Sequence, residues 1–484
     1  MSDTDAAPAA AGVAPAISPW WTMSIVMAAT TIVTLDQTIV NVALHSIGKD
    51  LGAGSGIEWI VIAYLLAVCV SQPATGWLAD RFGRKTVFIG SIVAFTCASC
   101  LCALSPTLTV LIAARVVQGF GGGALIPLGM AMAMDLFPPE RRGRSMAVWA
   151  TTVMVAPAIG PTVGGWLVSS FSWHWLFLIN VPFGVATVLA GLRLLPASEG
   201  GDQRPFDLPG LLLGAIGLST GVIGVSQGGQ WGWSSPIILA CLSGSVTMLG
   251  AFVLHELRVR DPLIEVRMFA IRPFRLAVLI AMLLAVTNFA RFIFVPLQMQ
   301  AARGFTAFEV GLMFIPAAIA SAIGMQVGGH AADRIGPRRP IVIGCVGVVV
   351  SMVGLWRLDR TSSVGLTVAL MALQGVMFGM AAPPLLVAGL GQVPSRILTQ
   401  ASAIRSITKD ISGATGVAVM TAVVTAQISG SASGASSWAA YKGAYVVAAF
   451  AGIVAVVLAV SLRPASDEGP FIAEGVGATA GAGS

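Results

Sequence analysis

The chain has few charged side chains for its length. Of its 484 residues only 10% are Asp, Glu, Lys or Arg, whereas 56% are hydrophobic. A soluble globule of this size needs a larger share of charge on its surface. The scarcity of charge therefore excludes an ordinary soluble domain and indicates that the lipid bilayer is the solvent of this protein.

Residues that bind metals or nucleotides are also scarce. The four histidines are isolated, and the closely spaced Cys97, Cys100 and Cys102 have no His or acidic residue beside them. We therefore expect the cysteines to be small packing residues and expect no metal site. No Gly-x-x-x-x-Gly-Lys-Ser/Thr loop occurs, which argues against an ATP-driven pump. We expect no cofactor, no nucleotide and no enzymatic activity; a membrane-embedded enzyme is the disfavoured alternative.

Long apolar runs, in contrast, are abundant. A helix needs about 20 apolar residues to cross the hydrocarbon core, and fourteen runs meet this requirement. The sequence thus predicts an all-α polytopic membrane protein. The expected spans are residues 21–44, 57–78, 86–104, 108–134, 145–169, 174–194, 208–227, 236–256, 274–298, 308–331, 340–357, 364–388, 402–427 and 440–462.

Lys and Arg are distributed unevenly over the loops between these spans. If the N-terminus lies in the cytoplasm, nineteen of the 27 basic residues fall on the cytoplasmic side and five on the outer side. This asymmetry follows the positive-inside rule and favours an even number of helices with both termini in the cytoplasm. It also explains the net charge of +6 without a nucleic-acid partner. The expected partners are the bilayer, protons and a small-molecule substrate, bound by a monomer in the cytoplasmic membrane.

Two segments of the chain repeat. Residues 76–86, GWLADRFGRKT, return in weaker form 253 residues later as GHAADRIGPRR, residues 329–339. Gln118-Gly119 followed by Pro127 returns at an offset of 256 as Gln374-Gly375 followed by Pro383. Two matches at nearly one offset indicate a six-plus-six duplication, as in many transporters.

This repeat predicts an organisation for the whole chain. The two surplus helices contain GGQWGW, residues 228–233, at their outer turn, where Trp side chains suit the membrane interface. We interpret this pair as a structural hairpin rather than a substrate site. The expected parts are a disordered tail (1–20), a six-helix bundle (21–194), a linker with the inserted helix pair and a basic segment (195–272), a second six-helix bundle (273–463) and a disordered tail (464–484).

Five motifs lie in order on the helices where one known family has them. They are LDQTIVNVAL at 35–44, the turn at 76–86, RVVQGFGGG at 115–123, APAIGPTVGG at 156–165 and FLINVP at 177–182. With them the chain, from Trp20 to Arg463, resembles a major facilitator superfamily transporter of the fourteen-helix drug:proton antiporter family.

The resemblance implies a function. It implies the major facilitator fold and proton-coupled efflux of lipophilic drugs by alternating access. A dedicated exporter of one metabolite, lipid or self-made antibiotic is the alternative. The segment at 156–165 resembles the family's antiporter motif, which implies exchange rather than symport. In this motif Gly residues allow close helix packing and Pro residues bend the helix. Its residues are Pro157, Gly160, Pro161, Gly164 and Gly165.

Asp36 is the candidate proton-coupling residue, with Arg115 as its partner. A carboxylate inside a spanning helix is costly unless it is paired, wetted or protonated. At about 1.5 Å per residue, Asp36 lies roughly 12 Å and Arg115 roughly 10 Å below the outer end of its helix. The two side chains therefore lie at similar depths and can pair. Burial disfavours the charged carboxylate and a guanidinium favours it, so Asp36 is suited to gain and lose a proton. The alternative is a static ion pair.

The turn at 76–86 is the candidate cytoplasmic gate. Asp80 can accept hydrogen bonds from a neighbouring helix N-terminus, Gly83 permits the tight turn, and the basic side chains can pair with acids such as Asp135. A purely topogenic basic loop is the alternative, but it leaves Asp80 and the glycines unexplained. The gate residues are Gly76, Asp80, Arg81, Gly83, Arg84, Lys85 and Asp135.

Further polar residues within the spans are weaker candidates. Arg291, one turn after Asn288, contributes to an anionic or polar substrate site or extends to the outer surface. Lys409 and Asp410 form a second charge site or a simple charge pair. The second copy has Pro337 in place of Arg84 and Met371 in place of Arg115, so we expect proton chemistry in the first half. The candidates for the substrate cavity are Gln37, Asn41, Tyr64, Asn288 and Arg291.

Overall fold

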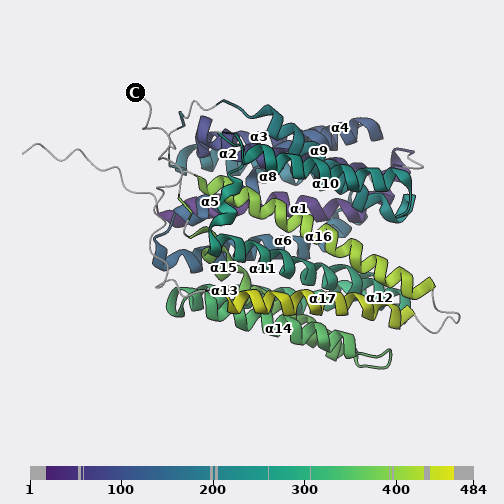
Figure 1. The fold of residues 1–484 in the computed structure, drawn as a ribbon. Coiled ribbons are helices and arrows are strands. Elements are labelled where there is room, and N and C mark those ends of the chain that lie inside the picture. The colour runs from purple at the N-terminus through teal and green to yellow at the C-terminus, as the bar shows by residue number, and fades with distance from the viewer. Residues whose placement is uncertain are drawn as a thin grey trace, which may run out of the picture.

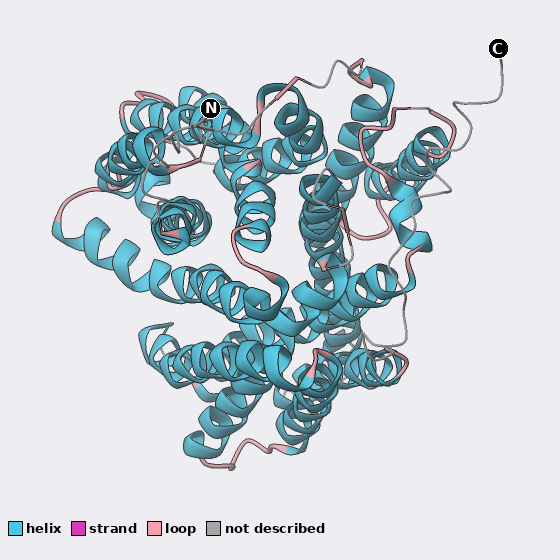
Figure 2. Ribbon diagram, turned by 90° about the vertical axis from the view of Figure 1, so that its left-hand side faces the viewer, coloured by secondary structure: helices cyan, strands magenta, loops and turns pink. Residues whose placement is uncertain are grey.

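The computed structural model describes most of the chain, and every regular element in the described part is a helix (Figure 2). The described residues are 18–52, 56–57, 59–196, 200–201, 205–259, 261–305, 307–391, 393–394, 397–429 and 437–462; within helices, some side chains, including those of 41, 45, 157 and 161, are not described. The expected disordered tails lie outside the described residues, except that the first helix already begins at Pro19.

The helices occur in the predicted order. Those of the first part are α1 (Pro19–Asp50), α2 (Trp59–Phe82), α3 (Arg84–Ala103), α4 (Leu108–Gly123), α5 (Leu125–Asp135), η1 (Pro139–Arg141), α6 (Arg142–Ser170), α7 (Trp175–Leu178) and α8 (Asn180–Leu194). The inserted pair is α9 (Leu208–Trp231) and α10 (Pro236–Glu256). Those that follow are η2 (Val266–Ala270), α11 (Arg272–Phe289), the π-helix η3 (Ala290–Phe294), α12 (Val295–Arg303), α13 (Ala307–Ile335), α14 (Arg338–Arg357), α15 (Val364–Leu390), α16 (Leu398–Ser429) and α17 (Ser437–Val460).

Local sequence explains where several helices begin. The side chains of Thr107, Asp207 and Ser363 each accept a hydrogen bond from a backbone N–H in the first turn of α4, α9 and α15. Such caps satisfy donors that a helix leaves open. Gly83 separates α2 from α3 with φ of 82°, a conformation that favours glycine.

Three predicted spans are interrupted. The span expected at 108–134 is divided at Ala124, the span at 174–194 at Ile179, and the span at 274–298 contains η3. The first two interruptions lie three residues before Pro127 and Pro182, and proline removes a backbone donor and crowds the preceding turn. Periodicity alone predicts continuous helices there, so these interruptions were missed.

The protein is a multi-pass membrane protein. Among the described residues, thirteen helical segments are long and apolar enough to cross a bilayer. The remaining long helix, α6, has 29 residues, a length of about 44 Å at 1.5 Å per residue. Large apolar side chains such as Val246, Phe450 and Val457 are exposed on the outside of the helices. An apolar surface of this kind requires lipid around it.

The long helices run side by side (Figure 1). α1 to α8 pack among themselves, and so do α11 to α17. The two sets meet where α6 packs on α13 and α15, and where α16 packs on α2 and α5. The hairpin of α9 and α10 packs on α2 and also contacts α16. It therefore covers the junction of α2 and α16 and leaves the two sets in direct contact elsewhere.

Both repeated turns lie at the same end of the bundle, which we call the turn end. The first joins α2 to α3 and the second joins α13 to α14. A buried hydrophobic cluster at this end combines residues of both sets, among them Met134, Phe137, Met268 and Leu398. A separate cluster fills the interior of the second set. The two sets are thus packed together at the turn end.

Close packing of α6 on α1 surrounds the position of Asp36. A Cβ atom on Gly164 would lie 2.8 Å from Ile39 Cγ1 and 2.9 Å from the Ile39 carbonyl oxygen. One on Gly160 would lie 3.0 Å from Thr38 Cβ. Both contacts are within the first turn of α1 after Asp36. The glycines therefore fix how closely α6 approaches the segment of α1 that carries the acid.

We predict that Gly164→Ala destabilises the protein by about 1–3 kcal/mol, because α6 must move away from α1. Alanine has a higher helix propensity than glycine, so propensity alone would stabilise the variant. A loss of stability therefore reports the steric contact of the new methyl group with Ile39. Thermal unfolding of the purified protein measures it. Gly244→Ala in α10 is the matched control, since nothing lies within 4 Å of its Cβ position. Equal melting temperatures for Gly164→Ala and the unmodified protein would contradict the prediction.

Candidate functional site

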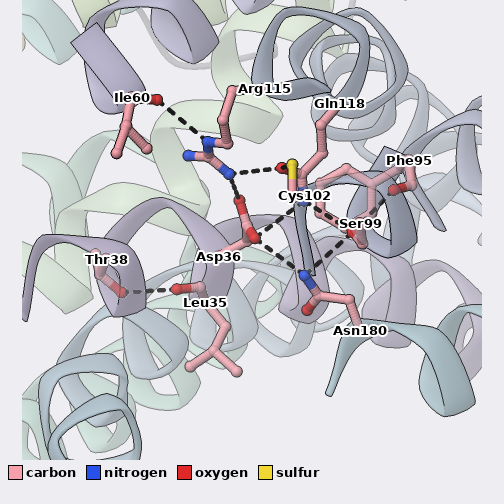
Figure 3. A network of polar contacts seen from close by, with 10 residues as sticks. All are labelled: Leu35, Asp36, Thr38, Ile60, Phe95, Ser99, Cys102, Arg115, Gln118 and Asn180. Carbon is pink, nitrogen blue, oxygen red and sulfur yellow. Dashed lines mark hydrogen bonds and ion pairs between the residues drawn. The ribbon is translucent and has the colours of Figure 1, made fainter. Parts of the chain in front are cut away.

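Asp36 and Arg115 form an ion pair inside the first set of helices. Arg115 Nη1 donates to Asp36 Oδ2 over 2.6 Å, and the two side chains are 1% and 0% exposed. Gln118 Nε2 and Asn180 Nδ2 donate to the other carboxylate oxygen over 3.1 and 3.0 Å. Asp36 thus accepts three hydrogen bonds from three side chains, an arrangement suited to an ionised carboxylate (Figure 3).

Arg115 is held on every side. Its Nε donates to the Ile60 carbonyl over 3.2 Å, and its Nη1 also donates to Gln118 Oε1 over 2.7 Å. The guanidinium carbon lies 4.1 Å from the centre of the Tyr64 ring, a cation–π distance. The candidate Tyr64 is therefore a direct neighbour of the charge pair. α2 and α4 supply the contacts that hold Arg115 opposite α1.

Gln118, Asn180 and Ser99 complete the network. Ser99 Oγ accepts from Gln118 over 2.8 Å and from Asn180 over 3.4 Å, and donates to the Phe95 carbonyl over 2.9 Å. Sequence reasoning quoted Gln118 and Asn180 within motifs but assigned them no role. The signal was present, because Gln118 lies one turn after Arg115 on the same face of α4. Asn180 opens α8, and only the fold brings it to Asp36.

The other cavity candidates divide between the two sets of helices. Gln37 is half-buried on α1 next to Asp36, and the side chain of Asn41 lies outside the described residues. Arg291 and Asn288 lie in the second set, where Arg291 Nη2 donates to Asn288 Oδ1 over 3.2 Å. Arg291 is 2% exposed, so it does not extend to the outer surface. Three of the five candidates thus belong to α1 and α2, and the other two to α11 and η3.

Lys409 and Asp410 pair with each other on α16. Their charged atoms are 3.1 Å apart, and their side chains are 46% and 41% exposed. Neither is buried as Asp36 is, and an exposed pair of this kind is an ordinary surface ion pair. The geometry favours the charge-pair interpretation for these two residues.

The first turn connects the two sets of helices. Gln400 on α16 packs over Gly76, with its Cα 3.5 Å from where a Cβ would stand, and its Nε2 donates to Asp80 Oδ2 over 3.5 Å. Arg84 pairs with Asp135 at the end of α5. Lys85 Nζ donates to two carbonyls at the end of α8, those of Leu192 and Leu195. Arg81 is exposed.

The second turn makes the contact that the sequence led us to expect of Asp80. Asp333 Oδ1 accepts from Gly143 N over 2.8 Å and its Oδ2 from Arg144 N over 3.0 Å, at the first turn of α6. A Cβ atom on Gly329 would lie 2.6 Å from Ala147 Cβ, so α13 and α6 touch here. A carboxylate at a helix N-terminus is favourable for both charge and hydrogen bonding. The sequence assigned the gate to the first turn alone, whereas in the structure the second copy also bridges the two sets.

The expected antiporter motif lies along α6 against α1. Gly160 and Gly164 make the close contacts described above, and Gly165 is half-buried. The side chains of Pro157 and Pro161 lie outside the described residues, although the helix is continuous from Arg142 to Ser170. The motif therefore positions the segment of α1 that holds Asp36, and it belongs to the helix whose first turn contacts Asp333.

We predict that Asp333→Ala opens the turn end more often. Loss of a carboxylate cap costs about 0.5–2 kcal/mol, which corresponds to about a 2- to 30-fold rise in the open population. Gln326 on α13 bonds to Thr151 on α6 across the same junction, so a cysteine at 326 reports opening. A water-soluble maleimide should label Gln326→Cys faster in purified Asp333→Ala protein. Asp359→Ala, at the opposite end, serves as the control and should leave the labelling rate unchanged. Equal rates in both backgrounds would refute the proposed contact.

Comparison with known proteins identifies the family to which this chain belongs. Residues 26–417 match the family model described as Major Facilitator Superfamily. The chain is 32% identical over 399 residues to the multidrug export protein EmrB of Escherichia coli K12, covering 81% of this chain and 78% of that protein. It is 30% identical over 407 residues to a multidrug resistance protein B homolog of Mycobacterium tuberculosis H37Rv, covering 83% and 75%.

Solved structures show the same fold. The proton:xylose symporter XylE superposes with a TM-score of 0.63 at 15% identity, covering 92% of this chain and 96% of that one. The human organic anion transporter MFSD10 superposes with a TM-score of 0.64 at 15% identity, covering 92% and 100%. With a family model matching most of its length and a shared fold, this chain belongs to the Major Facilitator Superfamily.

Proposed function

We propose that this protein is a proton-coupled antiporter that exports lipophilic small molecules across the cytoplasmic membrane. The turn end faces the cytoplasm, as do both termini, in agreement with the distribution of Lys and Arg. The names of its relatives, which include multidrug export and multidrug resistance proteins, support efflux as the direction of transport. No catalytic step is part of the proposal, which rests on binding and conformational change.

The observation that carries this proposal is the buried pair of Asp36 and Arg115. Its members lie in a spanning region at 0% and 1% exposure, where an unpaired charge is costly. A proton on Asp36 removes the negative charge and converts one acceptor oxygen into a donor. Arg115 then loses its counter-charge, and the link between α1 and α4 weakens. Proton binding and the ion pair therefore compete for the same carboxylate.

This competition couples proton binding at Asp36 to the conformation of the bundle. Asp36 on α1 lies next to the segment packed against Gly160 and Gly164 of α6, and α6 begins at the contact with Asp333. A movement of α1 at Asp36 can thus be transmitted to the turn end through α6, which contacts both places. We propose that residues 21–194 and 273–463 move as two bundles about this junction. The contacts of Gly76, Asp80, Gly329 and Asp333 then hold the cytoplasmic side closed and separate when it opens.

We predict that Asp36→Asn abolishes proton-driven exchange. The amide keeps the size of the side chain but cannot carry the exchanged proton. In everted vesicles with an imposed pH gradient, transport of the lipophilic cation ethidium should fall to about a tenth or less. Melting temperature and yield of the purified variant check that it folds.

The matched control is Asp359→Asn, which makes the same chemical change at an exposed acid paired with Lys442. It should leave ethidium exchange intact. Full exchange by Asp36→Asn would remove Asp36 from the coupling mechanism. Loss of exchange in both variants would show that the assay reports general damage.

A further inference from the structure

The second set of helices contains a buried cation with no acid beside it. Arg291, in the π-helix η3, is 2% exposed and forms no ion pair within the described part of the chain. Its Nη2 donates to Asn288 over 3.2 Å and its Nη1 to the Met371 carbonyl over 3.4 Å, while Nε is buried without a partner. A guanidinium has five N–H donors, so most of its bonding capacity is unused.

The two halves of the molecule differ at matching places. Met371 stands at the position that Arg115 occupies in the first half, 256 residues earlier. Where the first half brings an acid from α1 to an arginine on α4, the second half brings an arginine from η3 to the backbone of α15. The first pair is neutral overall, whereas the second site keeps a positive charge.

The part of α15 that contacts Arg291 carries buried polar side chains without partners. Gln374 is fully buried, and neither its amide nitrogen nor its amide oxygen has a hydrogen-bond partner. It lies between Met371, whose carbonyl accepts from Arg291, and Gly375, whose vacant Cβ position is 3.2 Å from Arg291 Nη1. Thr367 Oγ1, one turn before Met371, is also buried without a partner. Buried polar atoms of this kind are rare in native proteins unless something else satisfies them.

An aromatic surface adjoins the cation. The guanidinium carbon of Arg291 lies 4.8 Å from the centre of the Phe292 ring. Phe292 in turn stacks on Phe314 of α13, with ring centres 5.5 Å apart and planes at 19°. Guanidinium, amide and stacked rings together match a flat molecule that bears one anionic group.

We propose that Arg291 and Gln374 form an anion subsite that binds the carboxylate or sulfonate of an aromatic, lipophilic substrate. The proposal deepens the proposed efflux function, on which it rests, by naming a substrate class. An isolated buried cation destabilises the empty protein, and an anion restores neutrality without breaking an existing ion pair. A cationic substrate, in contrast, has no partner here. Asp36 is already paired with Arg115, and we assign proton coupling to that pair. The unpaired charge of Arg291 is therefore assigned to substrate binding.

Arg405 on α16 is another arginine of the second half with a buried donor, Nη1, that has no partner among the described residues. It is only partly buried as a whole, however, and no aromatic ring is stacked on it among the described residues. Arg405→Gln therefore serves as a matched variant, because it removes the same charge from the same half.

The test uses three probes with one aromatic body: 2-naphthalenesulfonate, neutral 2-naphthalenesulfonamide and the cation trimethyl(2-naphthyl)ammonium. The permanent charge of the sulfonate prevents pH-driven partitioning. Binding to the purified full-length protein is measured by calorimetry and by the shift in melting temperature. We expect the unmodified protein to bind the sulfonate about tenfold or more tightly than the sulfonamide.

Arg291→Gln should abolish that preference, while Arg405→Gln should keep it. Arg291→Gln should also raise the melting temperature of the empty protein, because the uncompensated charge is gone, and the sulfonate should no longer stabilise it. A purely structural arginine would give the opposite shift. Gln374→Leu, which keeps the cation, should weaken sulfonate binding several-fold and provides a second route to the answer.

Equal binding of sulfonate and sulfonamide by the unmodified protein overturns the proposal, as does a preference that Arg405→Gln abolishes and Arg291→Gln leaves intact. Transport in everted vesicles separates this failure from failure of the efflux function. If the pH gradient drives the ammonium probe but the sulfonate has no preferred site, only the subsite is lost. If the gradient drives none of the probes, the efflux proposal fails, and the binding data still decide the role of Arg291.

Discussion

The high cost of an unpaired charge in a low-dielectric interior constrains this structure more than any other factor. Asp36 and Arg115 are tolerated inside the bundle because each has the other, and because Gln118, Asn180 and Ile60 satisfy the remaining polar atoms. α1, α2, α4 and α8 must all approach closely to provide these partners. The close fit of α6 on α1 follows from the same requirement, since it holds the acid in register with its donors.

The sequence predicted the parts of this arrangement that depend on chain direction and length. Counting residues placed Asp36 and Arg115 at similar depths, and they are in contact in the structure. The sequence did not predict that Asn180 donates to Asp36. The approach of Asn180 depends on how α8 packs against α1, and hydrophobic periodicity carries no information about helix packing. The interruption at Ala124 was missed for a related reason: a proline near the start of a segment breaks the helix or bends it according to its neighbours.

The repeat was informative about position and misleading about roles. Its offset places the two turns at equivalent positions, but the second copy has Pro337 in place of Arg84, and the sequence assigned the gate to the first copy alone. Asp333 nevertheless accepts two backbone N–H bonds from α6. A carboxylate can make this contact wherever a helix N-terminus faces it. The packing between the two sets determines which helix N-terminus faces each turn, and the sequence does not reveal that packing. The same divergence leaves Arg115 neutralised and Arg291 uncompensated, so two similar bundles hold different charges.

The hairpin of α9 and α10 has a consequence for the membrane-facing surface of the bundle. It packs on α2 and reaches α16, so it lies along one of the two seams between the sets of helices. The other seam, between α6 and α13, has Trp166 and Ile319 among the apolar side chains exposed on those helices. The hairpin therefore covers the α2–α16 junction, whereas its main packing contacts among the described residues do not include α6 or α13. The two flanks of the bundle therefore differ in the surface that they present to the lipid, and the inserted pair of helices causes this difference.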